Sequence, residues 1–175
     1  MTALQVPVTA QDHWHGPRDA AVVLVEYGDY QCPYCGQAEP VVLRIRKELE
    51  ARVAVVFRNF PLPMHQQALP AALVAEFAGQ AHNGQFWPVH DGLYRHQRTL
   101  GPQLYREMLE ALDLPLDELE PAMAGGHLEA RIRADIEGGE RSGVDGTPAF
   151  FLNGQRVAIE RSYDELYEAV VRALG

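Results

Sequence analysis

The sequence predicts an α/β fold that carries an inserted block of helices, and three observations predict it. Two near-continuous apolar runs, at residues 20–27 and 53–57, stand on either side of an amphipathic segment. A third apolar run follows at residues 149–152, and the chain between about residues 66 and 141 holds helical patterns alone. Such runs suit strands that are covered on both faces. A length of 175 residues fits one domain with an inserted subdomain.

The first strand, the helix after it and the second strand form one unit. Val42, Ile45 and Leu49 recur at helical spacing, and Pro40 marks a kink or a second start in this helix. Strands joined through a helix normally lie parallel. The loop after residue 27 is therefore expected at the carboxyl end of the first strand, where α/β folds place their chemistry.

The remaining elements are read from local patterns. Four helices are predicted at residues 68–81, 86–96, 103–112 and 127–140. A strand at 149–152, a turn at Asn153-Gly154 and a return strand at 156–159 follow. Ser162 and Glu165 fit a capping box for a last helix through residue 174. We therefore predict a core domain of residues 1–63 and 143–175 with a helical insert at 64–142.

Composition excludes several classes of partner. The chain has 24 acidic and 15 basic residues, for a net charge of −9. Phosphate binding needs clustered cations, so nucleic acid is not an expected partner, and an anionic membrane surface would repel the chain. No apolar run approaches the roughly 20 residues of a membrane helix. No dimerisation segment is evident, so a monomer is expected.

The first ten residues contain no Lys or Arg and lead into no apolar core, unlike a secretory signal peptide. A cytoplasmic location is therefore expected. A periplasmic location is the alternative, if a signal sequence has been removed.

Both cysteines, Cys32 and Cys35, lie three residues apart, a spacing that about 1% of random pairs would have. A structural zinc site needs four ligands and this pair supplies two, without a second pair of matching spacing. A structural disulfide in so short a loop would constrain little of the unfolded chain. An unreactive pair is a further alternative, and a redox-active dithiol is the hypothesis that has a mechanism.

In the redox hypothesis a helix begins at the first cysteine and directs its free N–H groups at the sulfur. That arrangement favours thiolate over thiol and lowers the pKa of Cys32. Cys35 lies one turn further, within disulfide reach, and would resolve a mixed disulfide formed on Cys32. Pro33 and Tyr34 between them set the rigidity of the loop and its contact with substrate.

The segment E-Y-G-D-Y-Q-C-P-Y-C, a long helical insert and then G-T-P-A-F-F-L-N-G resemble the DsbA-like branch of the thioredoxin superfamily. The resemblance extends from about residue 13 to residue 174. It implies a thioredoxin fold with an inserted α-helical subdomain, and thiol–disulfide exchange on protein or peptide substrates without a cofactor. It places the catalytic cysteines at Cys32 and Cys35 and a cis-proline, which keeps metals off the thiols, at Pro148. The backbone of Thr147 would then pair with an extended substrate.

Three further residues near the cysteines have competing interpretations. Glu26 is either a water-facing residue at a strand end or, as the resemblance favours, a buried carboxylate that relays the proton of Cys35. Asp29 would oppose thiolate formation if it lay close to Cys32. Strongly oxidising members of the family carry a histidine where this chain has Tyr34, which argues against a very oxidising potential.

Other polar and aromatic residues are given structural roles. Arg58 is expected either to pair with Glu26 or to face water. The His13-Trp14-His15 segment is expected to lead into the sheet rather than to bind metal. Phe86-Trp87 and Tyr94 are expected to pack the helical block, with lining of a substrate groove as the alternative.

Two other function classes remain as alternatives. One is a peptide-binding or chaperone module, in which the cysteines are secondary. The other is a glutathione-dependent isomerase or transferase of similar fold, against which the second cysteine argues. Reduction or isomerisation is the expected direction in the cytoplasm and oxidation in the periplasm. No motif identifies a recycling partner.

Overall fold

The computed structural model of the protein describes residues 2–81 and 84–175 and confirms the α/β class. A five-stranded sheet has the order β1-β3-β2-β4-β5. Its strands are β1 (His13–His15), β2 (Val22–Gly28), β3 (Val53–Asn59), β4 (Ala149–Leu152) and β5 (Gln155–Arg156). The strands β2 and β3 are parallel and are joined through α1 (Pro33–Glu48), as predicted, and the other pairs are antiparallel.

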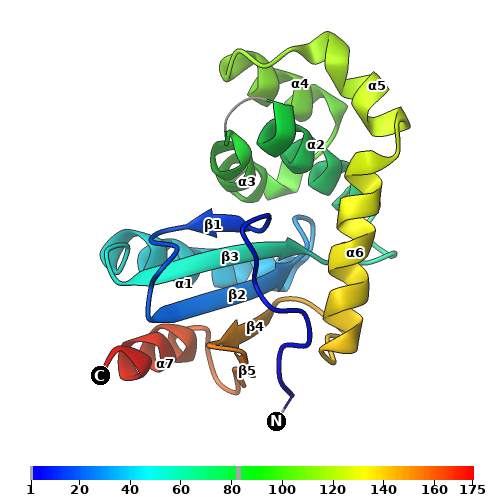
Figure 1. Cartoon of the computed structure of the whole chain (residues 1–175). Coiled ribbons are helices and arrows are strands. Elements are labelled where there is room, and N and C mark those ends of the chain that lie inside the picture. Colours follow the sequence, from blue (N-terminus) through cyan, green and yellow to red (C-terminus); the bar gives the residue numbers. More distant parts are fainter. Residues whose placement is uncertain (1, 82–83) are drawn as a thin grey trace.

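The helical insert lies between β3 and β4 in the chain. In Figure 1 its first four α-helices gather beyond the β1 edge of the sheet, and α6 runs from that group along the sheet. The helix α6 contacts both α2 of the insert and β3 of the sheet. The predicted domain limits at 63/64 and 142/143 stay predictions. The helices are α2 (Ala68–Ala81), α3 (Phe86–Arg95), η1 (Gln97–Thr99), α4 (Pro102–Ala111), η2 (Leu116–Glu118), α5 (Leu119–Ala124), α6 (His127–Arg141) and, after the sheet, α7 (Asp164–Leu174).

Side chains of β2 alternate between two buried faces, which explains why the strand is apolar almost throughout. Val22 and Leu24 pack in a cluster with α1 and α7, where Ile45 and Leu166 are fully buried. Val25 and Tyr27 lie on the other face, in a cluster that also takes in residues of the N-terminal segment and α6. The buried strand therefore holds its carboxyl end, and the loop after it, in a fixed place.

The core of the insert is continuous with the two cysteines. Cys32 and Cys35 belong to the same buried cluster as Phe86 and Tyr94 of α3, and Trp87 packs against it. The expectation that these aromatic residues pack the helical block is confirmed. The insert thus lies directly behind the loop that carries the cysteines.

Three local predictions are corrected. The return strand is β5, which spans 155–156 rather than 156–159, although the Val157 N–H still donates to Phe150 O at 2.9 Å. The carboxylate of Glu165 accepts the N–H groups of Glu160 and Arg161 at 2.7 and 3.2 Å, so the predicted capping box is wrong and α7 begins at Asp164.

The third correction concerns Pro40, for which a kink or a second start was expected. It lies inside one uninterrupted helix, so the second start is wrong. The turn at Asn153-Gly154 is confirmed, since both residues have positive φ, at 48° and 83°. The short helix α5 had not been predicted.

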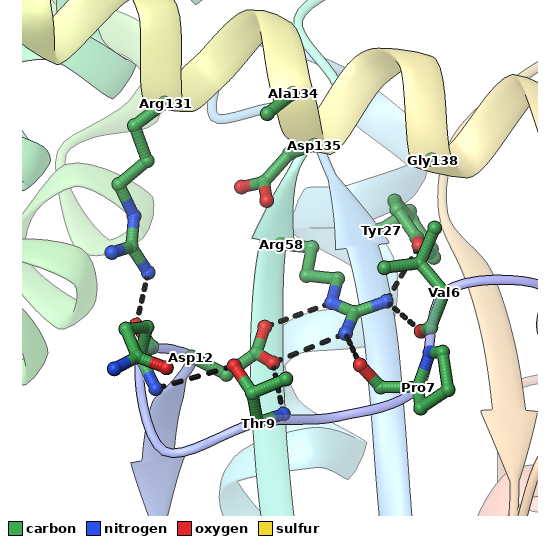
Figure 2. A pocket seen from close by; sticks show the side chains of 11 residues that line it. Val6, Pro7, Thr9, Asp12, Tyr27, Arg58, Arg131, Ala134, Asp135 and Gly138 are labelled. Carbon is green, nitrogen blue, oxygen red and sulfur yellow. Dashed lines mark hydrogen bonds and ion pairs between the residues drawn. The ribbon is translucent and has the colours of Figure 1, made fainter.

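The N-terminal segment is anchored by Arg58. This residue was expected either to pair with Glu26 or to face water, and both expectations are wrong. Its side chain is buried, and Nε and Nη2 donate to the two carboxylate oxygens of Asp12 at 2.8 and 3.1 Å. Nη1 donates to Val6 O and to the Tyr27 hydroxyl at 2.8 and 2.9 Å, and Nη2 also donates to Pro7 O at 3.1 Å. All five N–H groups of the guanidinium are therefore used. Figure 2 shows these bonds beside a cavity of about 180 Å³ under α6.

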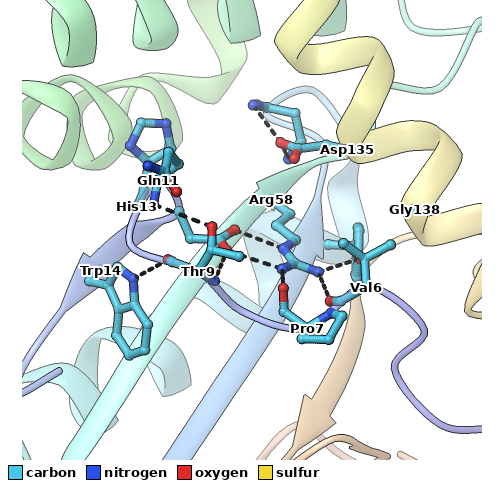
Figure 3. Close-up of polar contacts among 12 residues, drawn as sticks. Val6, Pro7, Thr9, Gln11, His13, Trp14, Arg58, Asp135 and Gly138 are labelled. Atoms are coloured by element: carbon cyan, nitrogen blue, oxygen red, sulfur yellow. Dashed lines mark hydrogen bonds and ion pairs between the residues drawn. The ribbon is translucent and has the colours of Figure 1, made fainter. Parts of the chain in front are cut away.

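Two more contacts hold the same segment. The Trp14 indole N–H donates to Thr9 O at 2.8 Å, as Figure 3 shows, and Arg131 of α6 donates to Gln11 O at 2.6 Å. The His13–His15 segment enters the sheet as β1, as expected, and His13 Nε2 lies 2.8 Å from the buried Glu76.

A half-buried carboxyl group also lies on this face. Asp135 of α6 accepts the backbone N–H of Asn59 at 2.9 Å, which fixes the end of β3. Burial raises the pKa of Asp135 to about 6.

Candidate functional site

Both cysteines lie at the start of α1. Cys32 is the N-cap residue and Cys35 lies within the first turn, and both are free thiols. Cys32 is only 3% exposed and Cys35 is fully buried. The Cys32 thiol lies 3.6 Å from Thr147 O, on the loop that precedes β4. The fold thus brings together two residues that are 115 positions apart in the chain.

The two thiols have opposite acidities. A hydrogen bond from Cys35 is the largest influence that lowers the pKa of Cys32, to about 5. Burial opposes that shift, while Thr147 and the N–H groups of Cys35 and Tyr34 add to it. Burial raises the pKa of Cys35 well above its usual value, and Cys32 and Glu26 raise it further. Cys32 is therefore the thiolate of the pair near neutral pH.

The predicted substrate-contact residues surround Cys32. The Thr147–Pro148 peptide bond is cis, as the resemblance implied. The Thr147 hydroxyl is buried and has no hydrogen-bond partner among the described residues. Pro33 occupies the first turn of α1, and Tyr34 is 61% exposed, so its ring stands at the surface beside a shielded sulfur.

Asp29 organises the loop before Cys32. Its Oδ1 accepts the N–H groups of Gln31 and Cys32 at 2.7 and 3.1 Å, and its Oδ2 accepts the N–H of Leu62 at 2.9 Å. His65 Nδ1 lies 2.7 Å from the same Oδ2. The suggested repulsion of the thiolate is not among the main influences on the pKa of Cys32.

Gln97 is a site residue that had not been predicted. Its side-chain amide donates to Tyr30 O at 2.9 Å and to Cys32 O at 2.8 Å. These bonds join η1 of the insert to Cys32 and Tyr30, which lie 65 and 67 positions earlier in the chain. A contact of this kind leaves no periodic or local pattern in the sequence.

Glu26 is buried rather than water-facing. It is 1% exposed, and its Oε2 has no hydrogen-bond partner in the described part of the chain. Burial raises its pKa well above the usual value, Glu39 adds to that shift, and Arg46 opposes it. Its position satisfies the structural condition of the proton-relay hypothesis, and its role stays a proposal.

Behind Glu26 lies a second group of buried polar side chains. Glu39 Oε1 is 3.7 Å from His90 Nε2, and Tyr30 forms a 2.9 Å hydrogen bond through its hydroxyl to His90 Nδ1. Within residues 2–81 and 84–175, neither carboxylate oxygen of Glu39 nor His90 Nε2 has a hydrogen-bond partner. These groups could exchange protons with one another.

One group of residues could in principle hold a metal ion. Glu39, His90 and Asp91 each place one ligand atom within 4.8 Å of the others. However, Arg46 already binds both carboxylate oxygens of Asp91, at 2.6 and 3.3 Å. Because this cation neutralises Asp91, we assign no metal to the group.

Among the helices of the described chain, none is long and apolar enough to cross a lipid bilayer.

Sequence comparison identifies relatives along nearly the whole chain. The family model described as Thioredoxin matches residues 8–172. A protein of Salinispora arenicola named Na(+)/H(+) antiporter NhaA 1 is 42% identical over 174 residues, which are 98% of this chain and 26% of that protein. A Mycobacterium protein of the same name is 34% identical over 149 residues, 83% of this chain and 24% of that protein. The chain therefore spans about a quarter of the length of the curated relatives it matches.

Solved structures share the fold. BdbD from Bacillus subtilis (oxidised) has a TM-score of 0.84 at 21% identity, covering 99% of this chain and 98% of that one. The thiol-disulfide exchange protein alpha-DsbA2 from Wolbachia pipientis has a TM-score of 0.80 at 16% identity, covering 93% and 87%. DsbA2 from Pseudomonas aeruginosa has a TM-score of 0.73 at 22% identity, covering 97% of both chains. The chain has the thioredoxin fold with a DsbA-like helical insert, and it belongs to the thioredoxin family.

Proposed function

We propose that the chain is a thiol–disulfide oxidoreductase that exchanges disulfides with protein or peptide substrates through Cys32 and Cys35. The observation that carries the proposal is the opposite acidity of the two thiols at one helix N-terminus. With a pKa of about 5, Cys32 is a thiolate at neutral pH, and the thiolate is the attacking form. The buried Cys35 keeps its proton until the second step. No metal or organic cofactor is part of the proposal.

The exchange has two balanced steps. The Cys32 thiolate attacks one sulfur of a substrate disulfide, so an S–S bond forms to Cys32 and the second substrate sulfur leaves as a thiolate. Cys35 then loses its proton and attacks the Cys32 sulfur, which forms the Cys32–Cys35 disulfide and releases the first substrate sulfur as a thiolate. The substrate gains two electrons, and the enzyme loses two. The reverse sequence oxidises a substrate dithiol.

Glu26 is the proposed acceptor of the Cys35 proton. It raises the pKa of Cys35, so the two groups interact through a water-poor interior. Burial raises the pKa of Glu26 well above its usual value, so this carboxylate has an increased affinity for a proton released nearby.

Substrate binding is assigned to Thr147, Pro33 and Tyr34. The Thr147 carbonyl faces the Cys32 sulfur, so its backbone is placed to pair with an extended segment beside the substrate disulfide. The exposed Tyr34 ring offers an apolar contact next to it. The Wolbachia neighbour is named a thiol-disulfide exchange protein, which supports this assignment.

The acidity of Cys32 bounds the expected reduction potential of the dithiol. A pKa of about 5 lies between about 7 for thioredoxin and about 3.5 for DsbA. Since a stabilised thiolate stabilises the reduced form, the potential is expected between about −270 and about −120 mV. The location is part of the same proposal. A value near the upper limit would favour the periplasm over the cytoplasm first expected, as does a neighbour described as a periplasmic thioredoxin-like protein from Salmonella enterica.

The state and partners of the full protein are also proposals. We propose that the chain acts as a monomer.

Variants of the two cysteines test the function. Exchange is measured by reduction of a disulfide-bonded peptide and by reactivation of a scrambled disulfide protein. Cys32→Ser is expected to abolish both activities, because the nucleophile is lost. Cys35→Ser is expected to retain the first step and to accumulate a mixed disulfide that mass spectrometry detects.

Three results would contradict the proposal in different ways. Unchanged suppression of aggregation in Cys32→Ser, with no exchange by the wild type, would favour the peptide-binding alternative. Conjugation of glutathione that survives Cys35→Ser, without disulfide exchange, would favour the transferase alternative. Full exchange in Cys32→Ser would exclude the mechanism outright.

A further inference from the structure

The amide of Gln97 connects the helical insert to the turn that carries Cys32. One nitrogen donates to two backbone carbonyls, those of Tyr30 and Cys32, at 2.9 and 2.8 Å. The Cys32 carbonyl also accepts the Gly36 N–H of the first turn of α1, at 3.1 Å. Gln97 therefore binds the backbone on both sides of Gln31, at the junction where the helix begins.

The other side of the turn is held by the core domain. Asp29 accepts the N–H groups of Gln31 and Cys32 through its carboxylate, and its own carbonyl accepts the Cys32 N–H at 3.1 Å. The N–H groups of the turn are thus fixed by the residue after β2, and two of its carbonyls by the insert. Without Gln97, the carbonyl side would keep only the bonds of α1 itself.

Gly36 reports the same arrangement from the opposite direction. A Cβ at this position would lie too close to the amide group of Gln97, whose Oε1 is the nearest atom. The obstructing atoms are the end of a flexible side chain and not backbone. A methyl group at residue 36 would therefore displace the Gln97 amide from its two carbonyls while leaving α1 in place.

We propose that Gln97 is a positioning residue, which sets the reactivity of Cys32 from the insert by fixing the turn at the start of α1. The inference rests on the proposed exchange function and deepens it. The N–H groups of Tyr34 and Cys35 stabilise the Cys32 thiolate, and their direction depends on how the first turn of α1 is seated. Without Gln97 the Tyr30 carbonyl would lose this donor and the Cys32 carbonyl would keep only the Gly36 N–H, so the turn would be free to shift and to move these N–H groups.

The test is the pH profile of Cys32 alkylation by iodoacetamide, from about pH 3 to about pH 8, which measures the thiolate fraction. Gln97→Ala is expected to move the midpoint to higher pH and to slow alkylation at about pH 5 at least about threefold. In glutathione buffers the same variant is expected to be more oxidised than the wild type, because its reduced form loses stabilisation. A purely structural residue would lower the melting temperature without moving this midpoint.

Gly36→Ala provides an independent variant. Alanine has a higher helix propensity than glycine, so the change would stabilise α1 if residue 36 did not lie against the Gln97 amide. Here the midpoint is expected to shift in the same direction as in Gln97→Ala. The double variant is expected to shift no further than Gln97→Ala alone, because the obstructing amide is gone. Gln103→Ala is the matched control, since the side-chain amide of this glutamine of α4 donates to Glu107 at the surface, at 3.0 Å.

An unchanged midpoint in a folded Gln97→Ala protein would overturn the proposal. So would a double variant that adds the full shift of Gly36→Ala to that of Gln97→Ala. If Gln97→Ala does not fold, Gly36→Ala carries the test alone, and an unchanged midpoint in it contradicts the inference. Absence of exchange in the wild-type chain would instead contradict the proposed function, and the comparison of midpoints would still decide the role of Gln97.

Discussion

Two buried polar regions of the molecule treat charge in opposite ways. In the first, the N-terminal anchor formed by Arg58, Asp12 and Tyr27, every N–H of the guanidinium has an acceptor. In the second, the acid cluster formed by Glu26, Glu39 and His90, each residue has at least one buried polar atom without a hydrogen-bond partner among the described residues. The two regions lie in one small domain and differ chiefly in this compensation.

The difference separates stability from chemistry. A buried charge with all its bonds made is costly to disturb, because removal of one partner leaves the other unpaired. An unpartnered buried carboxyl lowers stability but can take up or release a proton. The acid cluster lies behind Cys35, whose thiol must lose a proton in the proposed reaction. The anchor lies on the α6 face, and its Tyr27 belongs to a different buried cluster from the two cysteines. Variants can break or sharpen this contrast.

The largest expected effect is that of Arg58→Met. The change leaves the Asp12 carboxylate and the Tyr27 hydroxyl without their cation, so we expect a loss of about 3–5 kcal/mol in the free energy of unfolding. Urea denaturation of the reduced protein measures it. Arg133→Met is the matched control, because its exposed pair with Glu129 contributes about 0.5 kcal/mol or less. A loss below about 1 kcal/mol in Arg58→Met would mean that the anchor is not a stabilising region.

The next effect is a pH-dependent stability that belongs to the reduced form alone. The pKa of Cys32 falls from about 9 to about 5 on folding. A pKa that is lower in the folded state stabilises that state fully at pH values above the unfolded pKa. This contribution is lost as the pH falls to the folded pKa. Between about pH 5 and pH 7 the reduced protein should gain about 2–3 kcal/mol over the oxidised protein.

Thermal denaturation of both redox forms at the two pH values measures this gain. The Cys32→Ser protein, which lacks the thiolate, should show none of it. A difference between the redox forms that does not change with pH would show that Cys32 is an ordinary thiol.

A smaller effect is expected for Asp135→Asn, which tests whether compensation matters more than location. Asp135 lies near the anchor, but burial raises its pKa to about 6. A raised carboxyl pKa favours the folded state below the unfolded value of about 4, and that advantage is lost as pH rises through about 6. Asparagine keeps an acceptor for the Asn59 N–H and removes the charge. We therefore expect a gain of about 1–3 kcal/mol at pH 7 and little change near pH 4. Equal effects at both pH values would contradict the assignment.

Elements with strong local patterns were predicted well. The apolar runs that became β2, β3 and β4 need burial on two faces, and α2 was placed at its observed limits. The cysteine pair and Thr147-Pro148 were found because they lie in short contiguous motifs. The predictions failed where one side chain bonds a group that lies far away in the chain. Arg58 finds Asp12 at 46 positions away, and Gln97 finds Cys32 at 65. The capping box at Ser162 and Glu165 was a local failure, because the Glu165 carboxylate accepts the N–H groups of Glu160 and Arg161, which precede Ser162.

The contact between Cys32 and Thr147 also has a consequence for biosynthesis. Cys32 leaves the ribosome 115 residues before Thr147 does. Until β4 pairs with β2, the nascent thiol lacks its contact with Thr147. The site around Cys32 is therefore complete only after nearly the whole chain has been translated.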